Sequence, residues 1–510
     1  MSYAVALVGI NVVAVVGIAA LLLLRDEAGR RRGTLIFGAL ALLAALAWGN
    51  FGLFHGAGFF VHPWEQFHYA LGAKYFEEVG YDGLYVASLE AQVETMPGLP
   101  LPLITRDLRN NWLVSTPDLR EHAEEVKARF SPERWDSFLH DHAVHVTMAI
   151  GQFPREHLAE IRRDHGFHAT PSWIVLARLF GAEAPASPAM LGLYGAIDLL
   201  LLGVAFLVVL RTYGARTACV AALIFGTGHA WAFYWIGGSF LRMDWFVAVV
   251  LAACAARTGR MGVAGALLGV ASATRLFPAV LVLGPAMSCL RAWRHGHSRA
   301  PMLRLVAGTS LGLGIGLAAG CFTGRGAAAW PEFASSIGRH QQTWLSNNVG
   351  LRDVVAYDPS IVIRGDDPKA SVAWGDRLDR AMIARRPLML ALAGGFLLLV
   401  AAAAFRLEPD QALVISIVAV FALANLTCYY WIMLTLVALR PGRWMPVVVL
   451  ALAVAGRALE AAGTPAESLY GGLSWALAVA FVAWLLPDAL STVRGLRETE
   501  TPVHASGQDA

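Results

Sequence analysis

Two adjacent stretches decide the fold: an apolar run, LIFGALALLAALAWGNFGLF (35–54), and an amphipathic one, HPWEQFHYALGAKYF (62–76). The first is long enough to cross a bilayer as a helix. The second follows the first along the chain and is the beginning of a long polar segment. Pro63 suits the first turn of a helix, and Glu65 lies near the positive end of that helix. This order predicts a membrane protein with a carboxylate at the membrane edge.

The composition of the whole chain supports that class. Of 510 residues, 57% are hydrophobic and 15% are charged, whereas a soluble protein carries about 25% charged residues. The sequence therefore predicts an all-α polytopic membrane protein with about 13 transmembrane helices. The apolar runs fall at 4–24, 35–54, 189–210, 217–236, 244–256, 261–276, 278–290, 303–322, 387–405, 411–427, 429–439, 443–459 and 471–487.

The charges between these runs predict an orientation. Every second connection is short and rich in arginine, and basic connections face the cytoplasm. We therefore expect a multi-pass protein of the cytoplasmic (inner) membrane, with its N-terminus outside and its C-terminus inside. The expected parts are 1–54 (two spans), 55–187 (an outward loop domain with amphipathic helices), 188–322 (membrane helices), 323–386 (a second outward loop), 387–490 (membrane helices) and 491–510 (a disordered cytoplasmic tail).

Several function classes receive no support from the sequence. There is no P-loop signature and no GxGxxG between a strand and a helix, which argues against ATP-driven chemistry. The arginines are spread along the chain, and we expect no nucleic-acid partner. All five cysteines lie in or beside apolar runs, which excludes a disulfide framework in the loops.

Glu65 is the first candidate for catalysis. Transfer of a sugar from a lipid phosphate to a hydroxyl needs a base for the acceptor proton, but no acid, because the departing phosphate is already a stable anion. Trp64, Phe67, Leu71 and Tyr75 recur at spacings of three and four, and this stripe suits a membrane surface. In the alternative interpretation, Glu65 only stabilises its own helix.

Two further outward segments carry charge near the membrane edge. The segment GGSFLRMDW (237–245) contains Arg242 and Asp244, which are either functional groups or an ion pair anchoring a helix end. The segment ATRLFP (273–278) contains Arg275, which is suited to phosphate binding or, alternatively, to snorkelling toward the headgroups.

The second long loop contains RHQQTWLSNNVGLR (339–352), dense in amides and cations. Amides and a Trp ring suit sugar recognition; the alternative is a turn initiated by asparagines. The first loop is rich in histidine: His142 and His145 share a helix face, and Asp164-His165-Gly166-Phe167-His168 follows along the chain. They are candidates for a metal site, but the spacing matches no zinc pattern, and a solvated histidine-rich face is the favoured interpretation.

Together these pieces resemble the glycosyltransferase-C superfamily, and within it the polyprenol-phosphate-mannose-dependent mannosyltransferases. The matching residues are Glu65, Tyr69-Ala70, Gly80, Leu84-Tyr85, Arg275 with Pro278, and Asn347-Asn348-Val349-Gly350-Leu351. The chain differs from the family pattern in having Glu in place of Asp, one extra span before the catalytic loop, and a longer first loop.

The resemblance implies a membrane hexosyltransferase that moves a sugar from a polyprenyl-phosphate donor to a hydroxyl of a lipid, glycan or protein acceptor at the outer membrane face. Glu65 would be the general base. Arg275, Arg242 and His340 are the candidates for binding the donor phosphate, and Asn347, Asn348, Trp344, Tyr69, Asp82 and Asp244 for binding the sugar or acceptor. No cofactor is required, and a divalent metal is optional. The alternatives are a transporter or lipid flippase, and a metal-binding or hydrolytic protein using the first loop.

Overall fold

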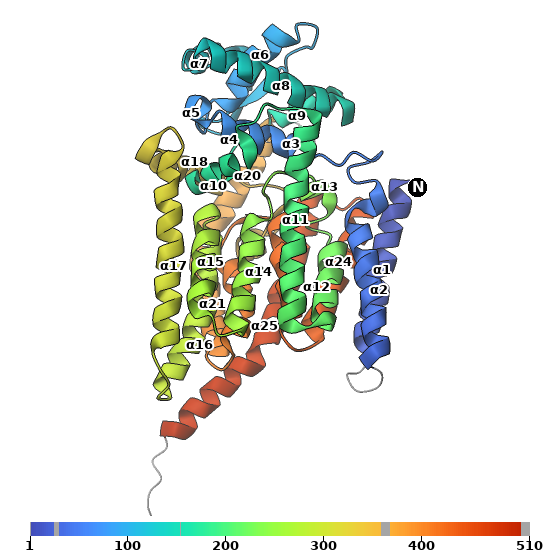
Figure 1. Ribbon diagram of the computed structural model, residues 1–510, viewed down its shortest axis with the longest axis vertical. Coiled ribbons are helices and arrows are strands. Elements are labelled where there is room, and N and C mark those ends of the chain that lie inside the picture. The colour runs from blue at the N-terminus through green and yellow to red at the C-terminus, as the bar shows by residue number, and fades with distance from the viewer. Residues whose placement is uncertain (1, 25–29, 153–154, 359–367, 501–510) are drawn as a thin grey trace, which may run out of the picture.

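The computed structural model describes residues 2–24, 30–152, 155–358 and 368–500. It is mostly helical, with 76% helix, and has two parts along its long axis (Figure 1). One part is a bundle of long apolar helices. The other, formed by the segment between α2 (Arg30–Trp48) and α11 (Pro188–Tyr213), is a cap on one end of that bundle.

Six helices of the described residues are long and apolar enough to cross a membrane. They are α1 (Tyr3–Leu23), α11, α17 (Ala300–Ala319), α21 (Arg386–Ala404), α24 (Trp444–Ala461) and α25 (Ala466–Glu500). Shorter bundle helices are α2, α12 (Ala215–Thr227), α13 (Phe233–Ile236), α14 (Asp244–Arg257), α15 (Met261–Thr274), α16 (Leu283–Arg294), α22 (Pro409–Ile415) and α23 (Ile417–Leu423). The prediction of a helical membrane protein is confirmed in this coarse sense.

Several predicted spans are not single α-helices. The run 217–236 stops at Thr227, the run 278–290 begins as the 3₁₀ helix η5 (Phe277–Val282), and the run 429–439 is the 3₁₀ helix η8 (Cys428–Leu439). Short, broken apolar helices are tolerated at membrane depth only where the protein itself surrounds them. In agreement, Cys428 and every residue from Trp431 to Leu439 in η8 are buried.

The cap is a small folded unit of its own. Its elements are α3 (Pro63–Gln66), the π-helical turn η2 (Phe67–Leu71), α4 (Gly72–Lys74), α5 (Phe76–Val79), α6 (Leu84–Thr95), β1 (Ile104–Asp107), β2 (Trp112–Ser115), η3 (Thr116–Leu119), α7 (Arg120–Lys127), α8 (Pro132–Gln152), α9 (Arg155–Ile161), α10 (Pro171–Ala177) and η4 (Arg178–Ala182). Strands β1 and β2 pair antiparallel, with Ile104 opposite Ser115.

The core of the cap explains why one sequence-based expectation is wrong. Phe67, Leu71 and Tyr75 are at most 3% exposed and pack against other residues of the cap, including Phe167 and Trp173. The stripe therefore faces the interior of the cap and does not lie on a membrane surface. The same periodicity suits either surface, because both are apolar.

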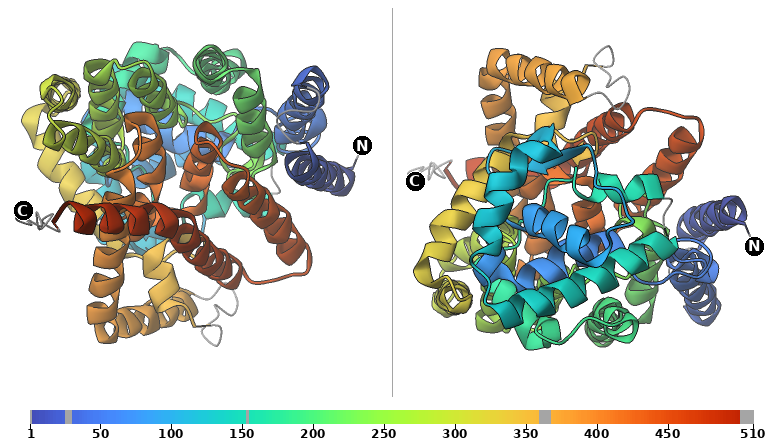
Figure 2. Two further views of the ribbon diagram at one scale, coloured as in Figure 1. Left: turned by 90° about the horizontal axis from the view of Figure 1, so that it is seen from below. Right: turned by 90° about the horizontal axis from the view of Figure 1, so that it is seen from above.

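The second long loop extends the cap end of the molecule. It contains η6 (Gly320–Phe322), η7 (Gly326–Ala328), α18 (Ala329–Gln342), β3 (Asn348–Val349), α19 (Leu351–Ala356) and α20 (Pro368–Ala384). Strand β3 pairs with β4 (Leu426–Thr427), which immediately precedes η8. The two short sheets are exceptions to the predicted all-α class. Seen along the long axis, α20 and α21 project from one side of the molecule (Figure 2).

The two ends of the chain differ in position. The first residues of α1 lie toward the cap end, whereas α25 runs to the opposite end of the bundle (Figure 1). Helix α25 continues to Glu500, so the predicted disordered tail is wrong for 491–500. The rest of that tail, 501–510, lies outside the described residues.

Glycines bring α15 and α17 into close contact. A β-carbon on Gly308 would collide with the carbonyl oxygen of Gly262, and one on Gly312 with that of Ala266. Small residues at such spacings let two membrane helices approach backbone to backbone. The contact fixes the position of α15, whose last turn leads into the site described next.

Candidate functional site

A buried ion pair joins the cap to the bundle. Glu65 of α3 meets Arg242, with Oε2 2.5 Å from Nε and Oε1 3.1 Å from Nη2. The two side chains are 13% and 5% exposed. The ring centroid of Tyr69 lies 4.2 Å from Cζ of Arg242. The hydroxyl of Tyr429 accepts a hydrogen bond from Nη2 of Arg242 at 3.2 Å. Three segments far apart in the sequence thus meet at one guanidinium.

The backbone around Arg242 is fixed from both sides. Gly238, at φ +68°, lies against the carbonyl of Phe60, and its own carbonyl accepts hydrogen bonds from the His62 amide (3.0 Å) and from Gln66 Nε2 (2.8 Å). The side chain of Asp198 in α11 accepts from the amides of Arg242 (2.9 Å) and Met243 (3.1 Å).

Strain accompanies this arrangement. Leu241, directly before Arg242, has a φ of +49°. A side chain with that backbone costs about 1–3 kcal/mol, and such residues cluster at functional sites. The segment therefore presents Arg242 to Glu65 at a cost in stability that the surrounding hydrogen bonds offset.

A second charged pair lies beside the first. Arg275 Nη2 is 3.8 Å from Asp244 Oδ1, and both side chains are under 9% exposed. Asp244 therefore pairs with Arg275 and not with Arg242, contrary to the ion-pair alternative. Arg275 also donates to the carbonyl of Thr274 at 2.8 Å and lies over the ring of Trp173. This burial excludes snorkelling as the role of Arg275.

Helix α10 of the cap holds both arginine-bearing segments. Trp173 Nε1 donates to the carbonyl of Leu241 at 3.0 Å, next to Arg242. Thr170, which caps α10, donates its hydroxyl proton to the carbonyl of Ala273 at 2.7 Å, close to Arg275. The cap therefore sets the spacing of the two cations.

The electrostatics at Glu65 suit a base. Burial raises its pKa above the ordinary value, while the charges of Arg242 and His68 act in the opposite direction. Burial and the charge of Arg242 lower the pKa of His62 to about 3. His62 is then neutral, and its Nδ1 accepts the amide proton of Glu65 at 3.3 Å. Glu65 is thus held by the neutral His62 side chain, which caps α3, and by one cation, Arg242.

His340 does not supply the cation expected from the sequence. Burial lowers its pKa to about 4, and its ring lies tilted by 31° against the ring of His168, with centroids 4.3 Å apart. Near neutral pH it reaches a phosphate only as a neutral hydrogen-bond donor. Within the described residues, Arg242 and Arg275 are the buried cations next to Glu65.

The candidates for sugar binding separate into groups. Tyr69 and Asp244 lie with the two arginines. The Asn347 carbonyl accepts from the amide of Cys428 at 2.9 Å, whereas Trp344 and Asn348 line a separate pocket. Asp82 lies near Arg109 and Arg325, and its charge raises the pKa of both.

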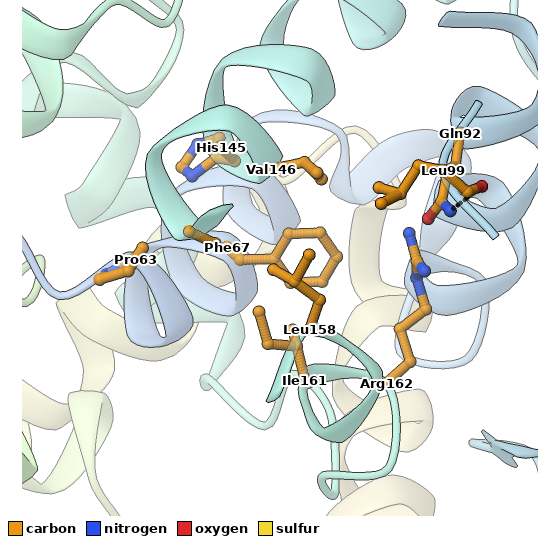
Figure 3. Close-up of a pocket in the computed structure, with 10 residues that line it drawn as sticks. Pro63, Phe67, Gln92, Leu99, His145, Val146, Leu158, Ile161 and Arg162 are labelled. Carbon is orange, nitrogen blue, oxygen red and sulfur yellow. Dashed lines mark hydrogen bonds between the residues drawn. The ribbon is translucent and has the colours of Figure 1, made fainter. Parts of the chain in front are cut away.

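The histidines of the first loop occupy an apolar setting. His142 and His145 are 0% and 3% exposed, so the predicted solvated face is wrong. His145 lines a pocket with Phe67, Val146 and Leu158, and Arg162 lies at the opposite end of that pocket (Figure 3). Arg162 Nη2 lies 3.4 Å from His142 Nε2. No group of three potential metal ligands occurs among the described residues.

Some residues of the site were not identified from the sequence. Asp198 had no assigned role, although a carboxylate inside an apolar run was a signal. Gln66, which is 0% exposed, and Tyr429 give no signal of their own in the sequence, because their partners lie 172 and 187 residues away.

Comparisons of the chain with protein-family models, with curated proteins and with solved structures found no match.

Proposed function

We propose that this chain is an inverting membrane glycosyltransferase that moves a sugar from a polyprenyl-phosphate donor to an acceptor hydroxyl, with Glu65 as general base. The observation that carries the proposal is the buried pair Glu65–Arg242 beside the second cation, Arg275. A base with two cations matches the needs of a reaction whose leaving group is a phosphate monoester anion.

In the unliganded arrangement, Arg242 occupies both oxygens of Glu65. A donor phosphate competes for the same guanidinium, because Arg binds phosphate and carboxylate in the same forked geometry. Once Arg242 turns to the phosphate, Glu65 loses its counter-charge and becomes a stronger base. Donor binding thus activates the base.

The reaction then needs one displacement. The acceptor oxygen attacks the anomeric carbon and its proton passes to Glu65. The bond from the anomeric carbon to the phosphate oxygen breaks, and the electron pair leaves with the polyprenyl phosphate. Arg242 and Arg275 stabilise the charge that develops on that oxygen.

We propose that the bundle crosses the cytoplasmic membrane with about thirteen segments, the N-terminus outside, the C-terminus inside, and the cap on the outer face. The opposite positions of the first residues of α1 and of the end of α25 agree with an odd number of crossings (Figure 1). A polyprenyl donor fits this arrangement, because its phosphate lies at the membrane surface, where the cap meets the bundle.

The test is transfer of labelled sugar from synthetic polyprenyl-phosphate hexoses by the full-length protein in liposomes. The Glu65→Gln variant should lose transfer while the protein still folds and still binds polyprenyl phosphate. Retained transfer by Glu65→Gln would remove the base from the scheme. Failure of the wild-type protein to use any such donor, while it binds polyprenyl phosphate, would favour the transporter or flippase alternative.

A further inference from the structure

A separate pocket opens between the second loop and the start of α25. The indoles of Trp344 and Trp374 form part of its wall and belong to one small apolar cluster. Ser468 and Gly471 of α25 line the other side.

Three polar atoms of the lining are buried without a hydrogen-bond partner among the described residues. They are Nδ2 of Asn348, Nε1 of Trp374 and Oδ2 of Asp353. Asn348 and Trp374 are each 4% exposed. Buried donors and acceptors are nearly always paired in folded proteins, so these three atoms are available to hydrogen-bond a polar ligand.

The kinds of atom define the chemistry of that ligand. Two of them, on Asn348 and Trp374, are N–H donors and need an acceptor, and the third, on Asp353, is an acceptor and needs a donor. A hydroxyl does both, whereas an ammonium group only donates and would leave the two N–H groups unpaired. A ligand with several hydroxyls therefore fits better than an organic cation in an aromatic cage.

We propose that this pocket binds a pyranose ring of a glycan through Asn348, Asp353 and Trp374. Its role as the acceptor site rests on the proposed function, and it names the acceptor as a glycan among the classes left open by the sequence. The binding itself does not depend on sugar transfer.

The connection between the pocket and the ion pair is short. Asn348 of β3 pairs with Thr427 of β4, and Tyr429, whose hydroxyl contacts Arg242, follows two residues later. The pocket and the Glu65 site therefore lie on directly connected segments of the chain. The pocket would position the chain whose terminal hydroxyl is to react.

The experiment measures binding of methyl α-mannopyranoside, methyl α-glucopyranoside and methyl α-galactopyranoside to the full-length protein in detergent, by calorimetry, with choline as the cationic probe. At least one glycoside should bind. Trp374→Phe keeps the ring but removes its N–H, and Asn348→Leu removes the amide; each should weaken binding about fivefold, the value of one hydrogen bond. The matched control is Trp330→Phe, whose N–H donates to the Leu317 carbonyl elsewhere and whose loss should leave affinity unchanged.

The outcomes separate the two proposals. The pocket assignment is overturned if no glycoside binds the folded wild-type protein, if choline binds in their place, or if both pocket variants bind as tightly as Trp330→Phe. A melting profile identifies any variant that fails to fold, in which case the other variant and the wild-type titration decide. Glu65→Gln should bind glycosides normally; glycoside binding without any sugar transfer by the wild type would refute the proposed function and leave the pocket standing.

Discussion

Glu65 and Arg242 should be strongly coupled in stability, and a double-mutant cycle measures this. The variants are Glu65→Gln, Arg242→Gln and the two combined. Breaking a buried pair on one side costs about 3–5 kcal/mol. We expect about 2–3 kcal/mol for Glu65→Gln, because its amide oxygen still accepts a hydrogen bond and the rings of Tyr69 and Tyr429 remain over Arg242.

The double variant leaves no unpaired charge, so its loss of stability should fall short of the sum of the single losses by about 2 kcal/mol. The assay is reversible unfolding in mixed micelles of a mild detergent and sodium dodecyl sulfate. Arg120 and Glu124 provide a matched control at 3.1 Å, because their side chains are 82% and 64% exposed; their coupling should be only about 0.3–0.5 kcal/mol. A coupling of Glu65 with Arg242 as small as this control would refute a buried, unscreened pair.

The remaining predictions concern catalysis and packing. Glu65→Gln should lower the transfer rate about 10²- to 10⁴-fold, the usual contribution of a general base, measured in liposomes. The wild-type rate should rise with pH through the pKa of Glu65, because only the deprotonated carboxylate accepts a proton. Burial raises this pKa above its ordinary value. A rate profile that is flat from pH 4 to 8, roughly the range around an unperturbed Glu, would contradict the assignment. Asp198→Asn should reduce kcat by up to about 100-fold through displacement of Arg242, and it should also weaken the binding of polyprenyl phosphate, because Arg242 binds that phosphate in the proposed scheme. Unchanged values of both would show that Asp198 does not position Arg242. Gly312→Ala should cost about 1–3 kcal/mol by forcing α17 from α15, whereas Gly314→Ala, with nothing within 4 Å, should be neutral or slightly stabilising; equal melting points would show that the helices are not in close contact.

The local parts of the site could be predicted from the sequence, because charge in an apolar setting is conspicuous. Glu65, Arg242 and Arg275 were each recognised from a few neighbouring residues, and the structure brings all three to one place. Their pairing could not be predicted. Glu65 and Arg242 are 177 residues apart, and only the packing of α14 against α15 shows that Asp244 belongs to Arg275.

The errors have a common physical origin. A helix face of Phe67, Leu71 and Tyr75 can meet lipid or protein, and periodicity does not distinguish them. The histidines at 142 and 145 are polar, yet in the structure they lie within the cap, where burial lowers the pKa of His145 to about 4. Hydropathy likewise found the apolar runs but could not show which of them continue as single helices, because the breaks depend on contacts with distant segments.

The hydrogen bonds that Trp173 and Thr170 donate to two backbone carbonyls have a mechanical consequence. Trp173 holds Leu241, and Thr170, three residues earlier, holds Ala273. A tilt of the cap would therefore move the guanidinium groups of Arg242 and Arg275 together, in the same direction. In the proposed transferase, the site would then open to admit a long isoprenoid and close on its headgroup in one movement, without independent motion of either loop.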